Sequence, residues 1–291
     1  MYALLFSLLA TTPTQAPAGS SHENLNALYK KLTHEGLDVG GKAKAKFPPP
    51  TMPDGLTPAQ QTAVIAKLIE KNYTYDQFTR NSTVAPQMIK IEDLPDSDPK
   101  NPARAVSVWF LAYCDFKKLD DDRFLERIMN ANKGTGSSGG ELKPTDLQKR
   151  GLTISAGNEN RESYGFVEFD FLDKVRIKVT GHAIWSRTEE SVVAAAEIDP
   201  RFNNDKEFPN EWRSLTKQGG QLKVGEPQPW SGAAMYVKIT KLQEPKGALF
   251  VEQHVIYQEP AGWFGAPNYL RAKLPPAVTD NVRKMRAEIQ K

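Results

Sequence analysis

The stretch YGFVEFDFLDKVRIKVTGHAIW, residues 164–185, decides the fold class. Apolar and polar residues alternate in it on both sides of Leu172 and Asp173, and such alternation is typical of β-strands with one buried face. The second strand places three apolar side chains on one side: Val175, Ile177 and Val179. The stretch therefore predicts a β-hairpin that turns at Leu172 and Asp173 and presents one face to a core.

Downstream of this hairpin the chain carries three more strand patterns and a closing helix. The predicted strands cover three segments: residues 191–198, 234–242 and 249–257. Residues 199–231 are polar and predict an irregular excursion. Pro275 and Pro276 predict the start of an amphipathic helix. One side of this helix carries four apolar residues: Val278, Val282, Met285 and Ile289.

Upstream of the hairpin, residues 105–116 form the strongest strand pattern in the chain. Both faces of this strand are apolar, so we expect it to be covered on both sides or to line a cavity with one of them. Before it, Thr57 is expected to cap a helix that runs to about Lys71, and residues 87–91 predict a short strand. After it, residues 122–130 predict a helix with carboxylates at its start.

A loop rich in glycine and serine covers residues 133–150. Within it, residues 134–139 match the spacing G-x-G-x-x-G of a dinucleotide-binding turn. The match follows a predicted helix instead of a strand, so the structural context of that motif is missing. We interpret the loop as a flexible linker, and a sub-boundary of the folded region could lie in it.

The first 18 residues predict a signal peptide. Residues 3–10 (ALLFSLLA) are an apolar run too short to span a bilayer, and residues 16–18 offer an A-x-A cleavage site. We therefore expect an exported protein, periplasmic or extracellular. No other segment approaches the roughly 18 consecutive apolar residues of a membrane-spanning helix.

Residues 19–55 are interpreted as a tether. They combine glycines, alternating lysines and the proline cluster FPPPTMP at 47–53. A segment of this composition is expected to bury little surface. Residues 56–291 are then predicted to form a single α+β domain.

The predicted fold class is α+β, an antiparallel β-sheet meander packed on helices with a C-terminal amphipathic helix. This order of elements resembles the helix-grip architecture of the START-like superfamily, as does the run FVEQHVIYQEPAGW at 250–263 that leads toward the final helix. The resemblance implies a curved sheet that wraps the C-terminal helix around an apolar cavity. It covers about residues 57–291 and rests on element order, without a diagnostic motif. A generic open sheet packed on helices, with no ligand, is an alternative.

Composition and charge limit the classes of function. Hydrophobic residues make up 39% of the chain and charged residues 25%, which excludes wholesale disorder. The net charge of +3 does not indicate a nucleic-acid partner. Residues 261–291 are basic, which we interpret as the solvated face of a docked helix, with weak attraction to anionic lipid headgroups as an alternative. Cys114 is the only cysteine and is interpreted as a small core residue.

Motifs for catalysis are missing from the sequence. It contains no H-E-x-x-H, C-x-x-C, P-loop or G-x-S-x-G pattern, and we predict neither a cofactor nor a metal. An enzyme is therefore less expected than a binding protein. For a hydrolase, His182 or His254 is the candidate base, with Glu168, Asp170 or Glu252 as its carboxylate partner.

The sequence favours binding of an apolar small molecule or lipid between the sheet and the C-terminal helix. Aromatic side chains on the predicted strands are expected to line the site: Trp109, Tyr113, Phe166, Trp185 and Tyr236. Two alternatives come from other classes, a hydrolase that uses His182 or His254 and an interaction module of the cell envelope.

Overall fold

The structure is a computed structural model. It describes residues 21–41, 43–95, 97–98, 100–121, 123–124, 127–128, 137–154, 160–264 and 269–291. The predicted signal peptide, residues 1–18, and part of the predicted helix at 122–130 lie outside the described residues. No helix among the described residues is both long and apolar enough to cross a membrane.

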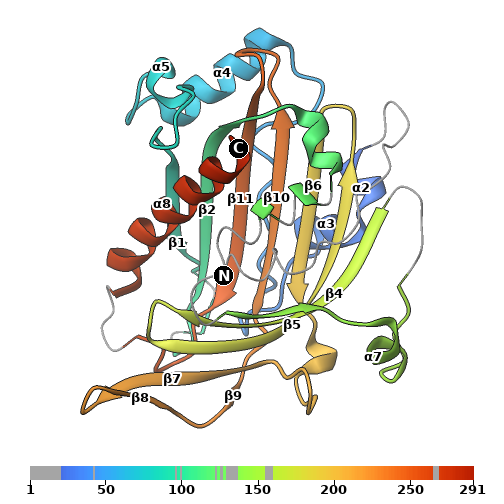
Figure 1. The fold of residues 1–291 in the computed structure, drawn as a ribbon, viewed down its shortest axis with the longest axis vertical. Coiled ribbons are helices and arrows are strands. Elements are labelled where there is room, and N and C mark those ends of the chain that lie inside the picture. The colour runs from blue at the N-terminus through green and yellow to red at the C-terminus, as the bar shows by residue number, and fades with distance from the viewer. Residues whose placement is uncertain are drawn as a thin grey trace.

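One large antiparallel sheet forms the centre of the protein (Figure 1). Its strands are β1 (Met88–Asp93), β2 (Ala103–Tyr113), β3 (Ser138–Glu141), β4 (Asn160–Phe171), β5 (Val175–Arg187), β6 (Ser191–Ile198), β7 (Glu211–Gln218), β8 (Gln221–Val224), β9 (Gln228–Pro229), β10 (Ala233–Lys241) and β11 (Ala248–Gln258). The main path runs β1-β2-β11-β10-β6-β5-β4-β3, and β7 pairs with β5, β8 and β9. The predicted α+β class with an antiparallel sheet is confirmed.

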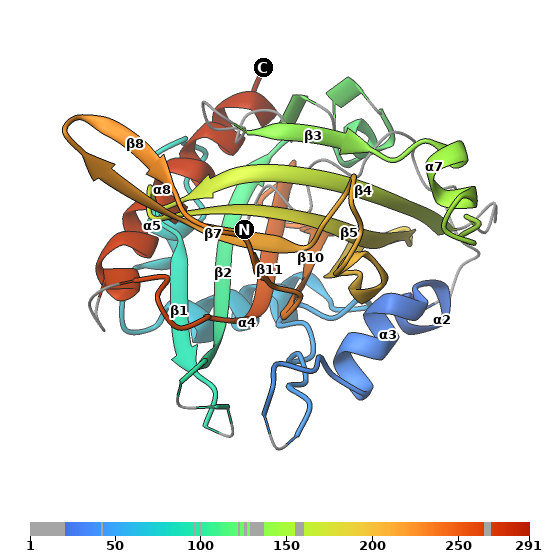
Figure 2. The ribbon, with the colours of Figure 1, turned by 90° about the horizontal axis from the view of Figure 1, so that it is seen from below.

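The helices lie on both sides of this sheet. They are α2 (His22–Leu25), α3 (Ala27–His34), α4 (Pro58–Ile69), α5 (Tyr75–Phe78), α7 (Pro144–Gln148) and α8 (Tyr269–Ile289). The C-terminal helix α8 covers one face, whereas α2, α3 and α4 lie against the other (Figure 2). We call these the helix face and the strap face.

The predicted hairpin is formed by β4 and β5. The two strands pair without a break from Phe171 opposite Val175 to the far end of β4. Leu172 and Asp173 have φ values of 52° and 55°, which is the left-handed geometry of the central residues of a tight hairpin turn, and Lys174 N–H closes this turn by donating to the carbonyl of Phe171. The alternation read from the sequence therefore sets the register, with the apolar side of β5 buried on the helix face.

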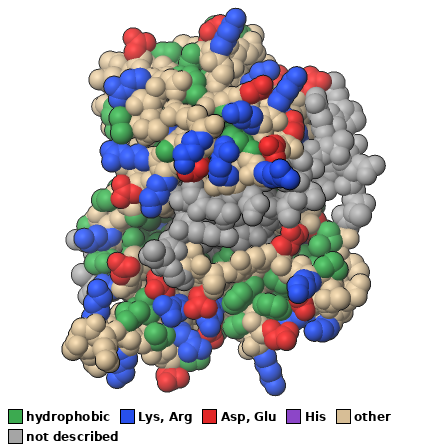
Figure 3. Space-filling view, viewed as in Figure 1, with side chains coloured by type: hydrophobic (Ala, Val, Ile, Leu, Met, Phe, Trp, Pro, Cys, Tyr) green, Lys and Arg blue, Asp and Glu red, His purple; other side chains and the backbone are tan. Residues whose placement is uncertain are grey.

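The closing helix begins earlier than predicted. α8 starts at Tyr269, so Pro275 and Pro276 lie inside it instead of opening it. Proline weakens a helix because it removes a backbone donor, but Leu270 and Leu274 before the prolines are buried in the core and hold the first turns in place. The predicted apolar side is buried. Four basic side chains are exposed on the outside: Arg271, Lys273, Arg283 and Lys284. Basic side chains are also seen in this part of the molecule in Figure 3.

Residues 21–56, which we call the strap, are packed on the sheet. The tether interpretation is wrong for these residues, because α2, α3 and the chain that follows them bury a row of apolar side chains: Leu25, Leu28, Tyr29, Leu32, Phe47 and Met52. Four of them, from Leu28 to Phe47, pack on Val193, Ala195 and Tyr236 of the strap face, and Met52 packs in a second cluster with Trp109 and Phe250. The strap is thus a structural layer of the fold.

Two further segments are more regular than predicted. Residues 138–141, expected in a flexible linker, form the edge strand β3 against β4, and α7 follows with Leu147 buried. The predicted excursion at 199–231 contains β7, β8 and β9. Both segments are polar because they pair at the margin of the sheet, where few side chains are buried.

Candidate functional site

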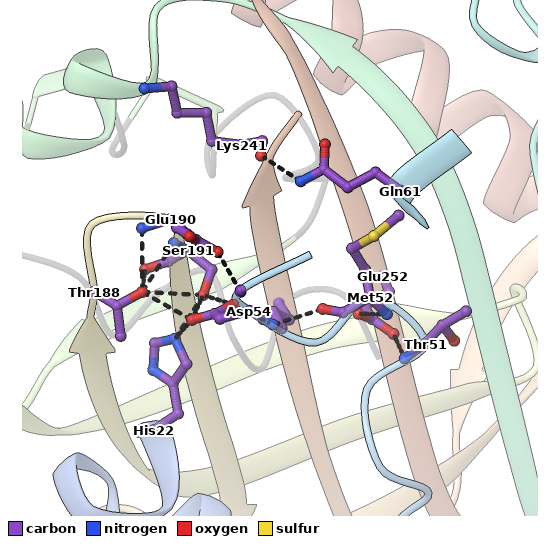
Figure 4. Close-up of polar contacts among 12 residues, drawn as sticks. His22, Thr51, Met52, Asp54, Gln61, Thr188, Glu190, Ser191, Lys241 and Glu252 are labelled. Atoms are coloured by element: carbon purple, nitrogen blue, oxygen red, sulfur yellow. Dashed lines mark hydrogen bonds and ion pairs between the residues drawn. The ribbon is translucent and has the colours of Figure 1, made fainter. Parts of the chain in front are cut away.

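A buried polar cluster lies between the strap and the sheet (Figure 4). Its charged members on the strands are Lys238 of β10 and Glu252 of β11, which are 2% and 0% exposed. A buried charge is stable only when hydrogen bonds replace its water. The strap supplies those bonds, as the contacts of the two side chains show.

Glu252 holds the backbone of the strap. One carboxylate oxygen accepts a hydrogen bond from the N–H of Thr51 at 2.6 Å, and the other accepts from Met52 N–H at 3.2 Å. His254 Nε2 lies 3.3 Å from the same carboxylate, and His254 Nδ1 lies 2.9 Å from the hydroxyl of Ser107. Glu252 is therefore occupied on both oxygens.

Lys238 holds the next part of the strap. Its ammonium donates to the carbonyl of Met52 and to Asp54, each at 2.6 Å. Asp54 also accepts from the hydroxyls of Ser191 and Thr188. Burial acts to raise the pKa of Asp54, but the charge and hydrogen bond of Lys238 outweigh it and hold that pKa below its ordinary value.

His22 closes the cluster at the start of the strap. Its Nδ1 lies 2.8 Å from Ser186 Oγ and its Nε2 lies 2.7 Å from Ser191 Oγ. Because the Asp54 carboxylate can only accept, Ser191 donates to it and His22 Nε2 must donate to Ser191. His22 is therefore not placed to take a proton from Ser191, and the histidine, serine and aspartate fasten the strap instead of forming a nucleophile and base.

The burial of His22 makes the fold sensitive to acid. Burial lowers the pKa of His22 to about 4 from 6.5, with Asp54 opposing this shift and Lys238 adding to it. The unfolded chain therefore binds this proton first as the pH falls. We expect the stabilisation to be complete above about pH 6.5 and up to about 3 kcal/mol of it to be lost by about pH 4.

Urea unfolding at a series of pH values measures this loss. The variant His22→Asn should show a flatter profile between those pH values, whereas His34→Asn, at an exposed histidine of the same strap, should keep the parent's slope. Equal slopes in the parent and in His22→Asn would contradict the assignment.

The two histidines predicted as hydrolase bases lie apart. His254 on β11 does meet Glu252, as expected, but it is 2% exposed and lies under the strap between the rings of Trp109 and Tyr236. His182 on β5 pairs with Glu162 at 2.8 Å, not with Glu168 or Asp170. Among the described residues, neither histidine–carboxylate pair has a solvent-accessible nucleophile beside it.

Unpartnered polar atoms gather on the helix face. Within the part of the chain that the structure describes, four buried side-chain atoms there have neither a hydrogen-bond partner nor an ion-pair partner: Trp185 Nε1, Gln253 Nε2, Tyr257 OH and Trp263 Nε1. Trp185, Tyr257 and Trp263 belong to the core between the sheet and α8. Gln253 faces the same side, since it alternates along β11 with Val251 and Val255 of that core.

Trp185 and Gln253 lie in one row across the sheet. Trp185 on β5 pairs with Ala194 on β6, Ala194 pairs with Val237 on β10, and Val237 pairs with Gln253 on β11. Three strand spacings separate the two residues, about 14 Å. The row therefore places two unpaired N–H donors at the ends of a short apolar surface.

A buried arginine stands near one end of this row. Arg187 follows Trp185 on the same side of β5, and its guanidinium lies 2.9 Å from Asp120 and 4.3 Å from the centre of the Phe116 ring. Burial lowers the pKa of Arg187 below its ordinary value, against the opposing charge of Asp120. No group of three or more potential metal ligands occurs in the part of the chain that the structure describes.

The five aromatic residues predicted to line a ligand site are not brought together. Trp185 lies on the helix face. The other four lie in three separate clusters. Trp109 and Tyr113 share one cluster of the strap face and Tyr236 lies in another, whereas Phe166 packs beside α7. Trp109 donates to Thr51 and Tyr236 donates to the carbonyl of Pro48, so both hold the strap.

Of the four side chains with unpaired polar atoms on the helix face, the sequence pattern did not single out three. Gln253 carries a signal, because it is a lone amide between Val251 and Val255 in an otherwise apolar face of a strand. Tyr257 and Trp263 show no such signal in the sequence. Their rings stack with centroids 6.4 Å apart, and this contact depends on the turn between β11 and α8.

Comparison with known proteins adds a fold likeness. No family model matches the chain. No curated protein matches it either. Among solved structures it is similar to human StAR-related lipid transfer protein 5, with 10% identity and a TM-score of 0.38 over 80% of this chain and 96% of that one. It is also similar to the lipid transfer and protein localization domain of human StarD13 (DLC2), with 8% identity and a TM-score of 0.35 over 70% and 90% of the two chains.

An uncharacterised protein from Rhizobium leguminosarum is similar as well, with 10% identity and a TM-score of 0.32 over 65% of this chain and 97% of that one. StAR-related domains are thus among the structures that this fold resembles, as its element order predicts. At these identities and TM-scores the likeness assigns the chain to no family.

Proposed function

We propose that this protein binds an apolar small molecule of lipid size, with at least one oxygen acceptor, between the helix face of the sheet and α8. The observation that carries the proposal is the set of unpaired buried polar atoms on that face: Trp185 Nε1, Gln253 Nε2, Tyr257 OH and Trp263 Nε1. Each unpaired group of this kind costs about 1–3 kcal/mol. A ligand that offers acceptors would recover part of that cost.

The chemistry of these atoms specifies the ligand. Two are indole N–H groups and one is an amide NH₂, which donate and do not accept, and the fourth is a hydroxyl. Carbonyl, hydroxyl or carboxylate oxygens are the partners that such donors need. Between Trp185 and Gln253 the sheet offers only Ala194 and Val237, so the middle of the ligand must be apolar.

Matched tryptophan variants test the proposal. Trp185→Phe removes an unpaired donor, so it should weaken the binding of an apolar fluorescent probe that carries a carboxylate about tenfold. Removal of this unpaired donor should offset part of the stability that the smaller ring loses in packing. Trp109→Phe is the control, since its indole already donates to Thr51 on the other face. That variant should lose about 1 kcal/mol of stability and keep the parent's affinity.

Native mass spectrometry of the protein purified from its own source identifies the ligand class. A defined adduct of lipid mass that is reduced in Trp185→Phe and in Gln253→Leu is the expected result. A bare chain mass, together with no binding of apolar probes, would overturn the proposal and leave buried water as the partner of the four atoms.

A further inference from the structure

The hairpin of β7 and β8 carries an exposed apolar surface that the proposed ligand site does not use. The structure describes four exposed large hydrophobic side chains, and two of them, Leu222 at 48% and Val224 at 39%, are in this hairpin. Two residues apart on β8, they lie on the same face of the strand. On a projecting element, two adjacent exposed apolar side chains are available for contact with a partner.

The tip of the hairpin projects freely. Gly219 and Gly220 form the turn with positive φ values, and a side chain added at either position would meet no atom within 4 Å. Figures 1 and 2 show the hairpin extending beyond the neighbouring strands. The exposed side chains therefore sit on an arm that can reach a surface ahead of the rest of the protein.

The charge of the arm has one sign. Residues 215–225 contain Lys217 and Lys223 and no acidic residue. Lys217 pairs directly with Leu222 across the two strands, so a lysine and a leucine share one face. Lysine beside exposed leucine and valine suits the boundary of a bilayer, where the alkyl stem can lie along the acyl region and the ammonium can meet phosphate.

A third lysine joins this arm to the start of α8. Leu215 N–H donates to the carbonyl of Lys174, whose exposed ammonium lies 5.6 Å from the centre of the Tyr269 ring. Tyr269 in turn donates to the carbonyl of Leu172. The arm, the turn between β4 and β5, and the first residue of α8 thus lie together.

We infer that the β7–β8 arm docks this protein on a membrane surface with anionic headgroups, with Leu222 and Val224 entering the boundary and Lys174 and Lys217 meeting phosphate. Lys223 starts from the opposite face of β8, and its long side chain reaches phosphate at the edge of the inserted arm. Attraction of each lysine to an anionic surface falls with ionic strength. The contribution of the apolar side chains to binding does not fall with ionic strength. A salt titration therefore separates the electrostatic from the apolar contribution.

Vesicle co-sedimentation of the full chain tests this inference. The parent should bind phosphatidylcholine vesicles that contain phosphatidylserine and bind pure phosphatidylcholine vesicles about tenfold more weakly. Leu222→Ser combined with Val224→Ser should reduce binding to the anionic vesicles about tenfold, and Lys217→Gln combined with Lys223→Gln should remove most of its salt dependence. Val84→Ser and Lys71→Gln, at exposed positions outside the arm, should leave binding unchanged.

A labelled variant measures insertion directly. An environment-sensitive fluorophore on Leu222→Cys, in a Cys114→Ala background, should shift to shorter wavelength with anionic vesicles, and the same label on Val84→Cys should not. Absence of parent binding, or equal binding of the Leu222 and Val224 variant, would overturn the inference. A change of that variant from dimer to monomer, with vesicle binding unaffected, would assign the arm to a second copy of the chain instead.

Discussion

Replacing Glu252 with glutamine should lower the free energy of unfolding by about 3 kcal/mol. Glu252 is fully buried, and its two oxygens accept from the backbone N–H groups of Thr51 and Met52. Glutamine has nearly the same shape, but its NH₂ group would face an N–H that it cannot accept from. One buried backbone donor of the strap would then have no partner. Chemical denaturation followed by tryptophan fluorescence measures the loss.

Glu190→Gln is the matched control for this substitution. Glu190 also accepts from the strap, from Gly55 N–H at 2.6 Å, but it lies in a partly exposed turn. Water can replace that bond, so the cost should be below about 0.5 kcal/mol. Trypsin should cleave the strap after Lys44 and Lys46 faster in Glu252→Gln than in Glu190→Gln. Equal stability of the two variants would show that the strap is not held by Glu252.

The strap also shows where the composition of a segment misleads. Glycine, proline and lysine dominate residues 36–53 and indicate a linker. The two short helices before it, α2 and α3, carry the opposing signal, since Leu25, Leu28 and Leu32 recur at helical spacing and all three are buried. The sheet side of this contact could not be foreseen, because Glu252 and Lys238 look like the polar positions of half-exposed strands until the strap covers them.

The sheet itself was largely predictable. Alternation in β5 and the double apolar face of β2 follow from the physical demand that each covered face be apolar. Both strands are found, although β2 begins two residues and ends three residues earlier than predicted. The β7–β8 arm was missed for the same reason, since a strand that buries little, such as Gln221–Val224, leaves no hydrophobic period to detect.

The candidate site was predictable only in part. Aromatic residues were selected by type, and Trp185 alone lies on the face that α8 covers. Strand alternation shows which residues share a face of one strand, but it does not show which face of each strand meets the helix. That choice depends on the pairing of β2, β11, β10, β6 and β5, which brings together residues far apart in the sequence.

Replacing Arg286 with methionine should lower the free energy of unfolding by about 4 kcal/mol and detach the C-terminal half of α8. Arg286 is 1% exposed. Its guanidinium donates to the backbone carbonyls of Leu111, Ala85 and Pro86, and so ties α8 to β2 and to the loop before β1. Methionine fills the space of the side chain but leaves these carbonyls without their donor.

Hydrogen exchange and a matched variant separate this anchor from a general loss of helix. Arg283→Met changes an exposed arginine one turn earlier on α8 and should cost less than about 0.5 kcal/mol. In Arg286→Met, backbone amides from Val278 to Ile289 should exchange much faster than in the parent, while those of β5 and β6 stay protected. Because α8 covers the helix face, Arg286→Met should also weaken probe binding. Unchanged protection of α8 in Arg286→Met would mean that apolar packing of Val282 and Met285 alone holds the helix on the sheet.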